Sequence, residues 1–315
     1  MSKLLVVFGA TGQQGGSVVT HVLNDPELSE EYRIRAVTRD ASSSGAKELQ
    51  SKGVEVVVAD LNDKASLLVA LKGANTVFSL TAPTMGPNGK ELEVSQGHAI
   101  ADAAVANKVQ YLIFSTLPHV STVSGGKYTE VVGFEAKAEV ETYIRSLPIR
   151  SAFFAPGSFM QNFNTFMVPR PNPAGPGSYV IARHVSPQSK LPLIDTVGDA
   201  GKFVGAILAD PDKYEGKTFC AATKLYTLQD MARIISEKSG KTVTYQQISE
   251  DDFRGAFPPQ LAGRADQLLQ MMSYQQEFGY YGPDTEELVK WAGENARGKL
   301  TTFEEYLDRC PLPLL

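Results

Sequence analysis

The feature that most constrains this chain is a glycine-rich turn directly after its first apolar run, residues 4–7. Gly9, Gly12 and Gly15 have the spacing of a strand–turn–helix unit that binds the pyrophosphate of a dinucleotide. The first glycine makes the tight turn, the second admits the phosphates, and the third lets the helix pack against the strand. The helix then directs free N–H groups and the positive end of its dipole toward the anion. The turn therefore predicts a dinucleotide site, with a plain connecting turn as the alternative.

Alternating apolar and helical segments extend this unit into a sheet. Five further apolar segments are typical of buried parallel strands, at 34–37, 54–58, 76–80, 111–114 and 150–154. Helical patterns separate them, at 12–24, 46–52, 64–71, 92–107 and 135–146. Strands that alternate with helices are joined by right-handed crossovers. We therefore expect an α/β protein with a doubly wound, parallel Rossmann domain over residues 1–155.

The sequence changes character near Pro156, and residues 156–315 are expected to form a smaller α+β lobe, some segments of which can return to the first domain. Prolines recur through residues 168–176, so this stretch predicts a surface loop, either a connector or the cover of a pocket. Helices are expected at 227–239, 261–277 and 303–309. The run 268–281, rich in methionine and aromatic residues, predicts core material, with an apolar pocket or a partner groove as alternatives.

Composition argues against several classes of function. The net charge of −5 provides no overall basic surface, so we expect no direct contact with nucleic acid. Cys220 and Cys310 have neither metal-ligand spacing nor the number needed for a disulfide framework, and no metal site is expected. The amino terminus lacks a signal-peptide pattern, and no apolar run reaches membrane-spanning length. We therefore expect a soluble, intracellular protein.

The residue after the second strand distinguishes the two common dinucleotides. A carboxylate there accepts hydrogen bonds from a free ribose 2′-hydroxyl, whereas an arginine pairs with a 2′-phosphate. This chain has Arg39, followed by Asp40. Arg39 favours NADP(H), Asp40 leaves NAD(H) open, and a solvated surface charge is the alternative for Arg39.

Asp60 follows the third strand in the same way. Its carboxylate could accept a hydrogen bond from the adenine amino group, or it could cap the helix that begins near Lys64, as Asp63 is expected to do. Both roles stay open from the sequence.

Beyond the glycine turn, several motifs resemble those of one known family. They lie at residues 7–18, 37–39, 134–141, 159–162 and 301–307, and Asp60 accompanies them. On these residues the chain resembles the NmrA-like family, atypical members of the short-chain dehydrogenase/reductase superfamily, over nearly its whole length. The resemblance implies a Rossmann fold with a preference for NADP(H).

The resemblance also implies which residues contact the cofactor. Pyrophosphate contacts are implied for the backbone of Gly9, Ala10, Thr11, Gly12, Gln13 and Gln14. A 2′-phosphate contact is implied for Arg39, and adenine contacts for Asp60 and Leu61. The nicotinamide half is implied to lie near Thr81, Ala82, Lys137, Phe159, Met160, Gln161 and Asn162.

The sequence departs from the usual catalytic pattern of the superfamily. Active members carry a tyrosine four residues before the helix lysine, whose charge lowers the tyrosine pKa so that the phenol can transfer a proton. Lys137 is present, but Gly133 stands where the tyrosine is expected. Lys137 is therefore a candidate ribose-binding and catalytic residue, with a solvated helix charge as the alternative. His119 is a candidate substrate-facing group, with a loop histidine of no chemical role as the alternative, and Tyr128 is a weak substitute acid.

Two functions follow from these observations. The leading hypothesis, implied by the resemblance, is a redox-sensing regulator that binds NADP(H) and acts through protein partners, such as a GATA-type transcription factor in fungal members. The alternative is an NADPH-dependent reductase of a quinone- or enone-like molecule, with Lys137 at the nicotinamide ribose. We expect a monomer or homodimer in the cytoplasm, with the nucleus as a second location for a regulator.

Overall fold

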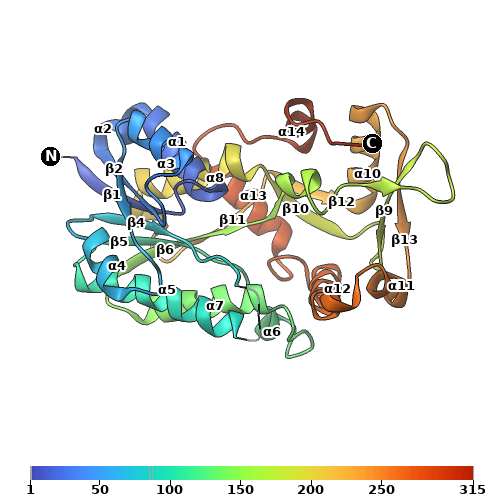
Figure 1. Cartoon of the computed structure of the whole chain (residues 1–315), viewed down its shortest axis with the longest axis horizontal. Coiled ribbons are helices and arrows are strands. Elements are labelled where there is room, and N and C mark those ends of the chain that lie inside the picture. The colour runs from blue at the N-terminus through green and yellow to red at the C-terminus, as the bar shows by residue number, and fades with distance from the viewer. Residues whose placement is uncertain (1, 85, 87, 315) are drawn as a thin grey trace.

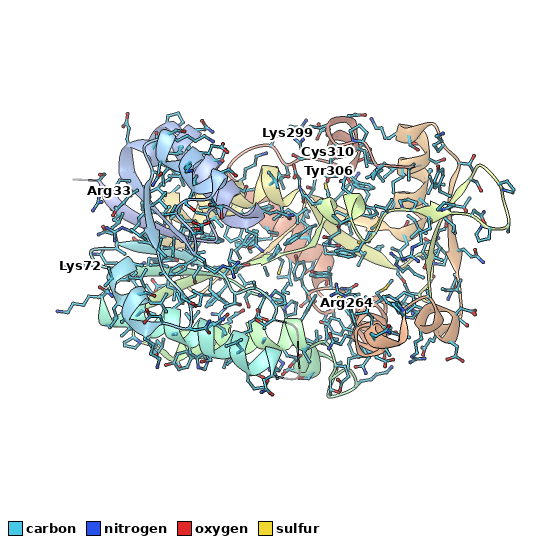
Figure 2. The ribbon with its side chains drawn as sticks, viewed as in Figure 1. Arg33, Lys72, Arg264, Lys299, Tyr306 and Cys310 are labelled. Atoms are coloured by element: carbon cyan, nitrogen blue, oxygen red, sulfur yellow. The ribbon has the colours of Figure 1, made fainter. Side chains whose placement is uncertain are left out.

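The structure, a computed structural model, describes residues 2–84, 86 and 88–314. It is elongated, with a layered α/β part that holds the amino terminus at one end and a smaller lobe at the other (Figure 1). Side chains fill the space between the elements of both parts (Figure 2).

The larger part is built on a parallel sheet in the order β11-β6-β5-β4-β1-β2-β3. Its strands are β1 (Lys3–Phe8), β2 (Tyr32–Thr38), β3 (Glu55–Val58), β4 (Thr76–Ser79), β5 (Tyr111–Ser115), β6 (Arg150–Pro156) and β11 (Thr218–Ala221). The six strands expected from the sequence are confirmed, and so is the Rossmann-like α/β fold. The strand order reverses between β1 and β4, and ligands bind beside such a reversal at the carboxyl ends of the strands.

Helices cover both faces of this sheet (Figure 1). They are α1 (Gln13–Asn24), α2 (Pro26–Glu31), α3 (Ser44–Ser51), α4 (Lys64–Ala70), α5 (Gly89–Ala106) and α7 (Val132–Ser146). The short helix α6 (Val120–Val123) lies beyond the end of α7, and its Val120 packs in the core of the smaller lobe. Side chains of β1 alternate between two cores, as the pleat requires. Leu5 and Val7 pack with α1, whereas Leu4, Val6 and Phe8 pack in the core that includes α4, α5 and α7.

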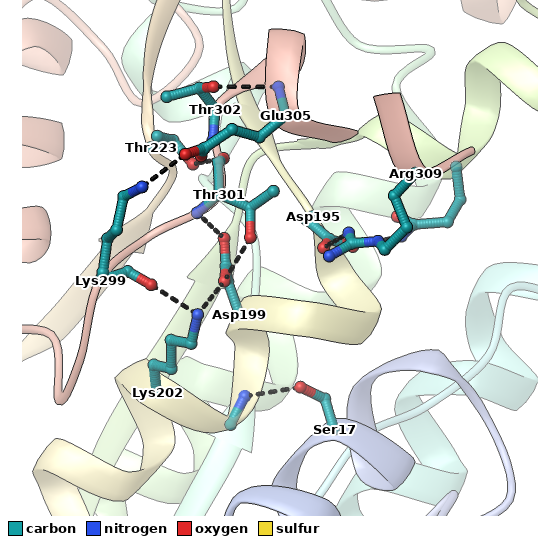
Figure 3. Close-up of polar contacts among 12 residues, drawn as sticks. Ser17, Asp195, Asp199, Lys202, Thr223, Lys299, Thr301, Thr302, Glu305 and Arg309 are labelled. Atoms are coloured by element: carbon teal, nitrogen blue, oxygen red, sulfur yellow. Dashed lines mark hydrogen bonds and ion pairs between the residues drawn. The ribbon is translucent and has the colours of Figure 1, made fainter. Parts of the chain in front are cut away.

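Residues 156–315 supply the smaller lobe and also part of the larger one. Strand β11 is the seventh strand of the main sheet, and α8 (Thr196–Ala209) lies along α1. The contact is close because α8 carries glycine here. A Cβ added at Gly201 would lie 2.4 Å from the Ser17 carbonyl oxygen, and the Gly201 N–H donates to Ser17 Oγ at 2.9 Å (Figure 3).

The smaller lobe contains two three-stranded sheets, β12-β10-β7 and β13-β9-β8. Its strands are β7 (Ser158–Phe159), β8 (Arg170–Pro171), β9 (Tyr179–Arg183), β10 (Lys190–Ile194), β12 (Lys224–Thr227) and β13 (Val243–Gln247). Its helices are η1 (Met160–Asn164), α10 (Leu228–Ser239), α11 (Glu250–Gly255), η2 (Pro259–Leu261), α12 (Ala262–Phe278) and α14 (Phe303–Arg309). Helix α9 (Pro211–Tyr214) packs in the core of the larger part, and α13 (Thr285–Asn295) packs against both parts.

Two expectations for this half are confirmed. Only the two residues of β8 in the proline-rich segment join a sheet, at its edge, and that segment is mostly exposed. The methionine- and aromatic-rich run supplies core, since Tyr274 is fully buried, Tyr280 and Tyr281 belong to the same core cluster, and Leu269 is buried.

A buried carboxylate on α8 bonds to the segment before α14 (Figure 3). The fully buried Asp199 carboxylate accepts hydrogen bonds from Thr301 N at 2.8 Å and from Lys202 Nζ at 2.7 Å. Burial raises the pKa of Asp199, and the bonds from Lys202 and Thr301 oppose that rise. Arg309, at the end of α14, pairs with the fully buried Asp195.

Among the described residues, no helix is both long enough and apolar enough to cross a bilayer.

We expect Gly201→Ala to lower the free energy of unfolding by about 1–3 kcal/mol, because the added methyl group overpacks the α1–α8 contact. Urea unfolding followed by circular dichroism measures this. Gly133→Ala in α7 is the matched control: a Cβ there meets no described atom within 4 Å, and alanine favours the helix. Equal unfolding free energies for the two variants would contradict the close α1–α8 packing.

Candidate functional site

The glycine turn brings the start of α1 over the end of β1. Gly9 has a φ of +61°, which favours glycine, and the Gly12 N–H closes the turn by donating to the Gly9 carbonyl at 2.8 Å. A Cβ at Gly15 would lie 2.4 Å from that carbonyl oxygen, so only glycine fits there without a shift. Gly9 and Gly15 thus have the conformational and packing roles expected from the sequence.

The N-terminus of α1 is open to an anion. Its capping residue, Gly12, has no side chain to accept a hydrogen bond, and within the described residues the N–H groups of Gln13 and Gln14 have no partner. A Cβ at Gly12 would come within 3.3 Å of the Gly9 carbonyl oxygen, so the turn is tight at this position. Free N–H groups at a helix dipole fit the pyrophosphate of a dinucleotide.

Arg39 and Asp40 lie beside this turn but differ in their partners. Gly45, at the start of α3, would contact the Thr11 side chain with an added Cβ, which places the loop after β2 next to the glycine turn. Asp40 Oδ1 accepts hydrogen bonds from Ser42 N at 2.7 Å and Ser42 Oγ at 2.6 Å, and these bonds lower the pKa of Asp40. Arg39 is exposed and has no hydrogen-bond or ion-pair partner among the described residues. Arg39 is therefore the residue of this pair that has no partner, whereas Asp40 stays an ionised carboxylate whose Oδ1 is engaged by Ser42.

Asp63 caps α4 as expected, accepting from Ala65 N at 3.0 Å. Asp60 does not cap this helix. Its Oδ1 accepts hydrogen bonds from the backbone N–H and the side-chain amide of Asn62, which stabilises the local turn. Its Oδ2 has no partner in the part of the chain that the structure describes. Leu61 is half-buried and packs against the core that includes α4, α5 and α7.

Lys137 lies in a buried polar cluster rather than on a solvated helix face. Its Nζ donates to the Thr81 carbonyl at 2.8 Å, to Thr81 Oγ1 at 3.2 Å and to Glu93 Oε1 at 2.5 Å, while Thr81 Oγ1 donates to the same Glu93 oxygen. Glu93 is 2% exposed. Burial lowers the pKa of Lys137, and the Glu93 charge opposes that change. All three hydrogens of the ammonium are thus engaged.

Close packing of α5 on α7 brings Glu93 to Lys137. One turn after Glu93, Gly97 lets Val140 approach, since an added Cβ would lie 2.4 Å from Val140 Cγ2. Sequence reasoning did not assign Glu93 a role. The available signal was a carboxylate four residues before a helix glycine.

The remaining residues expected near the nicotinamide occupy different environments. Ala82 is exposed after Thr81. Phe159 packs at the margin of the main core, and the Met160 side chain is fully buried in the core of the smaller lobe. Gln161 bonds to Asp195 Oδ1 and to Thr196 N, so it joins η1 to α8. The Asn162 side-chain amide has no partner among the described residues.

A second polar cluster follows the carboxyl end of β5. His119 Nδ1 lies 3.0 Å from Glu135 Oε2, and Ser121 donates to both Glu135 oxygens, through N at 2.8 Å and Oγ at 2.9 Å. Glu135 is 4% exposed, whereas His119 is partly exposed and its Nε2 has no partner in the described part of the chain. A carboxylate that fixes one imidazole nitrogen leaves the other free to exchange a proton. The sequence suggested His119 but not its Glu135 partner.

Other candidates are directed elsewhere. Tyr128 Oη donates to Glu277 Oε2 at 2.9 Å and its ring packs against Tyr274, which joins it to α12. His98 stacks on Tyr143 with 3.8 Å between ring centroids. Within the described ranges, no group of three or more His, Cys, Asp or Glu side chains is arranged to hold a metal ion.

The parallel sheet, the glycine turn beside its reversal and the open helix N-terminus define the Rossmann class of protein. The chain belongs to the NmrA-like family, which it matches over residues 1–307.

Individual relatives agree with this assignment. An NmrA-like family domain-containing protein of Dictyostelium discoideum is 30% identical, over 98% of each chain. The NmrA-like family domain-containing oxidoreductase FrzB of a Cladobotryum species is 29% identical, over 79% of this chain and 77% of its own. The crystal structure of NmrA, a negative transcriptional regulator, in complex with NADP superposes with a TM-score of 0.79 at 23% identity, covering 98% of this chain and 95% of that one. This likeness shows a shared fold.

We expect Glu93→Gln and Lys137→Met each to lower the free energy of unfolding by about 3–5 kcal/mol, because each leaves one buried charge unpaired. The double variant should lose less than the sum, in a double-mutant cycle measured by urea unfolding.

The pair of Lys90 and Glu139 joins the same two helices at the surface, with 2.7 Å between Nζ and Oε1. The same cycle on Lys90→Met and Glu139→Gln should give at most about 1 kcal/mol. Equal coupling energies for the two pairs would contradict the buried cluster.

Proposed function

We propose that this protein binds NADP(H) and reduces a conjugated, quinone- or enone-like carbonyl compound. Three observations support cofactor binding: the glycine turn, the uncapped start of α1 and membership of the NmrA-like family. Arg39 would pair with the 2′-phosphate, since it is exposed beside the turn and has no partner among the described residues. Asp60 and Leu61 would face the adenine, and Thr81, Ala82 and residues 159–162 the nicotinamide half.

The observation that carries the reductase proposal is His119 held by Glu135. NADPH, when bound, supplies a hydride. Reduction of the carbonyl compound would leave a negative charge on its oxygen, which would need a proton. His119 Nε2 would donate that proton, and the Glu135 carboxylate would stabilise the protonated ring and fix its orientation. This donor would perform the role for which Gly133 has no side chain.

Lys137 has two parts in this proposal. Its bonds to Thr81 fix the chain at the carboxyl end of β4, beside the strand reversal. The longest of its three bonds, 3.2 Å to Thr81 Oγ1, is the one it would exchange for a ribose hydroxyl.

A regulator that responds to the cofactor state is the second candidate. It is favoured by Gly133 in place of the usual tyrosine and by the saturated donors of Lys137, which would let binding occur without turnover. In this case, a protein partner such as a GATA-type factor would distinguish two conformations with different affinities for NADP(H).

Arg39→Ala should lower the preference for NADPH over NADH about ten- to hundredfold, the range of a charge-assisted hydrogen bond. Calorimetric titration of both cofactors measures this. Arg33→Ala is the control, since Arg33 is also exposed on β2 but faces Glu55. A native protein that binds the two cofactors equally would contradict the role of Arg39.

With quinones and enones as acceptors, we expect the native protein to consume NADPH and His119→Gln to lower kcat about a hundred- to ten-thousandfold. The dissociation constant for NADPH should be unchanged. His98→Gln, on the outer side of α5, should retain full turnover. Tight NADPH binding without turnover of any acceptor would overturn the reductase proposal and favour the regulator.

A further inference from the structure

An edge strand of the smaller lobe borders a groove that the cofactor chemistry does not use. The groove has a volume of about 730 Å³ and lies between β13 and α10. Val243, Thr244, Tyr245 and Gln247 line it from the strand. Helix α10 lines it from the other side with Gln229, Asp230, Ala232, Arg233, Ser236 and Glu237. β13 is the outermost strand of its sheet, paired only with β9 among the described strands.

The register fixes which backbone groups of β13 face β9. At one end the Tyr179 N–H donates to the Thr242 carbonyl, and at the other the Ile248 N–H donates to the Arg183 carbonyl. In a parallel pair, alternate residues of a strand direct both backbone groups to the same neighbour. Residues 242, 244, 246 and 248 therefore bond to β9, and Val243, Tyr245 and Gln247 direct their groups away from it.

One hydrogen bond shows the direction of the outward groups. The Val243 N–H donates to Ser236 Oγ on α10 at 3.3 Å, so the free edge faces the helix across the groove. The Val243 carbonyl and both backbone groups of Tyr245 and Gln247 have no partner in the described part of the chain. These donors and acceptors recur every second residue, a pattern that matches another extended backbone.

The helix wall adds a charge preference. Asp230 and Glu237 flank Arg233, which lies 3.5 Å and 2.8 Å from their respective carboxylates. Two carboxylates against one guanidinium leave this wall negative, so it suits a basic side chain on the occupant.

We propose that the groove between α10 and β13 binds an extended, lysine- or arginine-containing segment of a protein partner, which adds to β13 as a fourth strand. Main-chain hydrogen bonds to Tyr245 and Gln247 supply the affinity, and the wall formed by Asp230, Arg233 and Glu237 selects the basic side chain. This site is independent of the proposed reductase activity and of NADP(H).

A phage library of random decapeptides, selected on the full-length protein, tests the proposal. We expect enriched peptides that contain a basic residue and bind with micromolar dissociation constants in fluorescence anisotropy. Arg233→Trp, which fills the groove, should weaken binding at least tenfold. If Arg233→Trp does not fold, Gln229→Trp, on the same wall of the groove, takes its place. Lys290→Trp on α13, exposed and outside the groove, should bind as the native protein does.

N-methylation of the selected peptide identifies the binding mode. Methyl groups on one alternate set of peptide amides should abolish binding, and those on the other set should leave it intact. No enriched peptide, binding to the groove variant as tight as to the native protein, or indifference to N-methylation would each overturn the proposal. So would a concentration-dependent dimer that Arg233→Trp dissociates, because a second copy would then fill the groove.

Discussion

The contact of Gly15 with the backbone at the end of β1 determines the position of the start of α1. Without a side chain at Gly15, the helix approaches the carbonyls of Phe8 and Gly9 far closer than any Cβ would allow. The first N–H groups of α1 then lie at the carboxyl edge of the sheet, next to the reversal between β1 and β4. The loop carrying Arg39 lies against this turn, so the anion-binding features depend on one backbone contact.

The same dependence on close approach recurs on both sides of the sheet. Gly201 lets α8 meet α1, and this contact joins the carboxyl-terminal half to the Rossmann layer. Gly97 lets α5 meet α7, which brings Glu93 to Lys137. A buried lysine without such a partner would be strongly destabilising. The pairing of Glu93 with Lys137 therefore depends on the close helix packing that Gly97 allows.

Sequence patterns predicted the local features of the chain and missed the long-range ones. The six strands and the cap at Asp63 are encoded in short windows of apolar periodicity and turn residues. β11 joins β6 across more than sixty residues of intervening chain, and no local signal marks it. The partners Glu93 and Glu135 were missed for the same reason, because a carboxylate's burial depends on which helix packs against it. Asp60 left two roles open, and its Oδ1 accepts hydrogen bonds from the backbone and side chain of Asn62 in a local turn.

Calorimetric titration of NADPH into the native protein and into Gly12→Val tests the central claim most directly. A Cβ at Gly12 comes within 3.3 Å of one carbonyl oxygen, so valine should fold with a small adjustment. Its branched side chain should occupy space that the pyrophosphate needs at the turn. We predict binding by the native protein and none by the folded variant, whose far-ultraviolet circular dichroism should be native. Equal heats of binding for the two proteins would show that the glycine turn does not hold the cofactor.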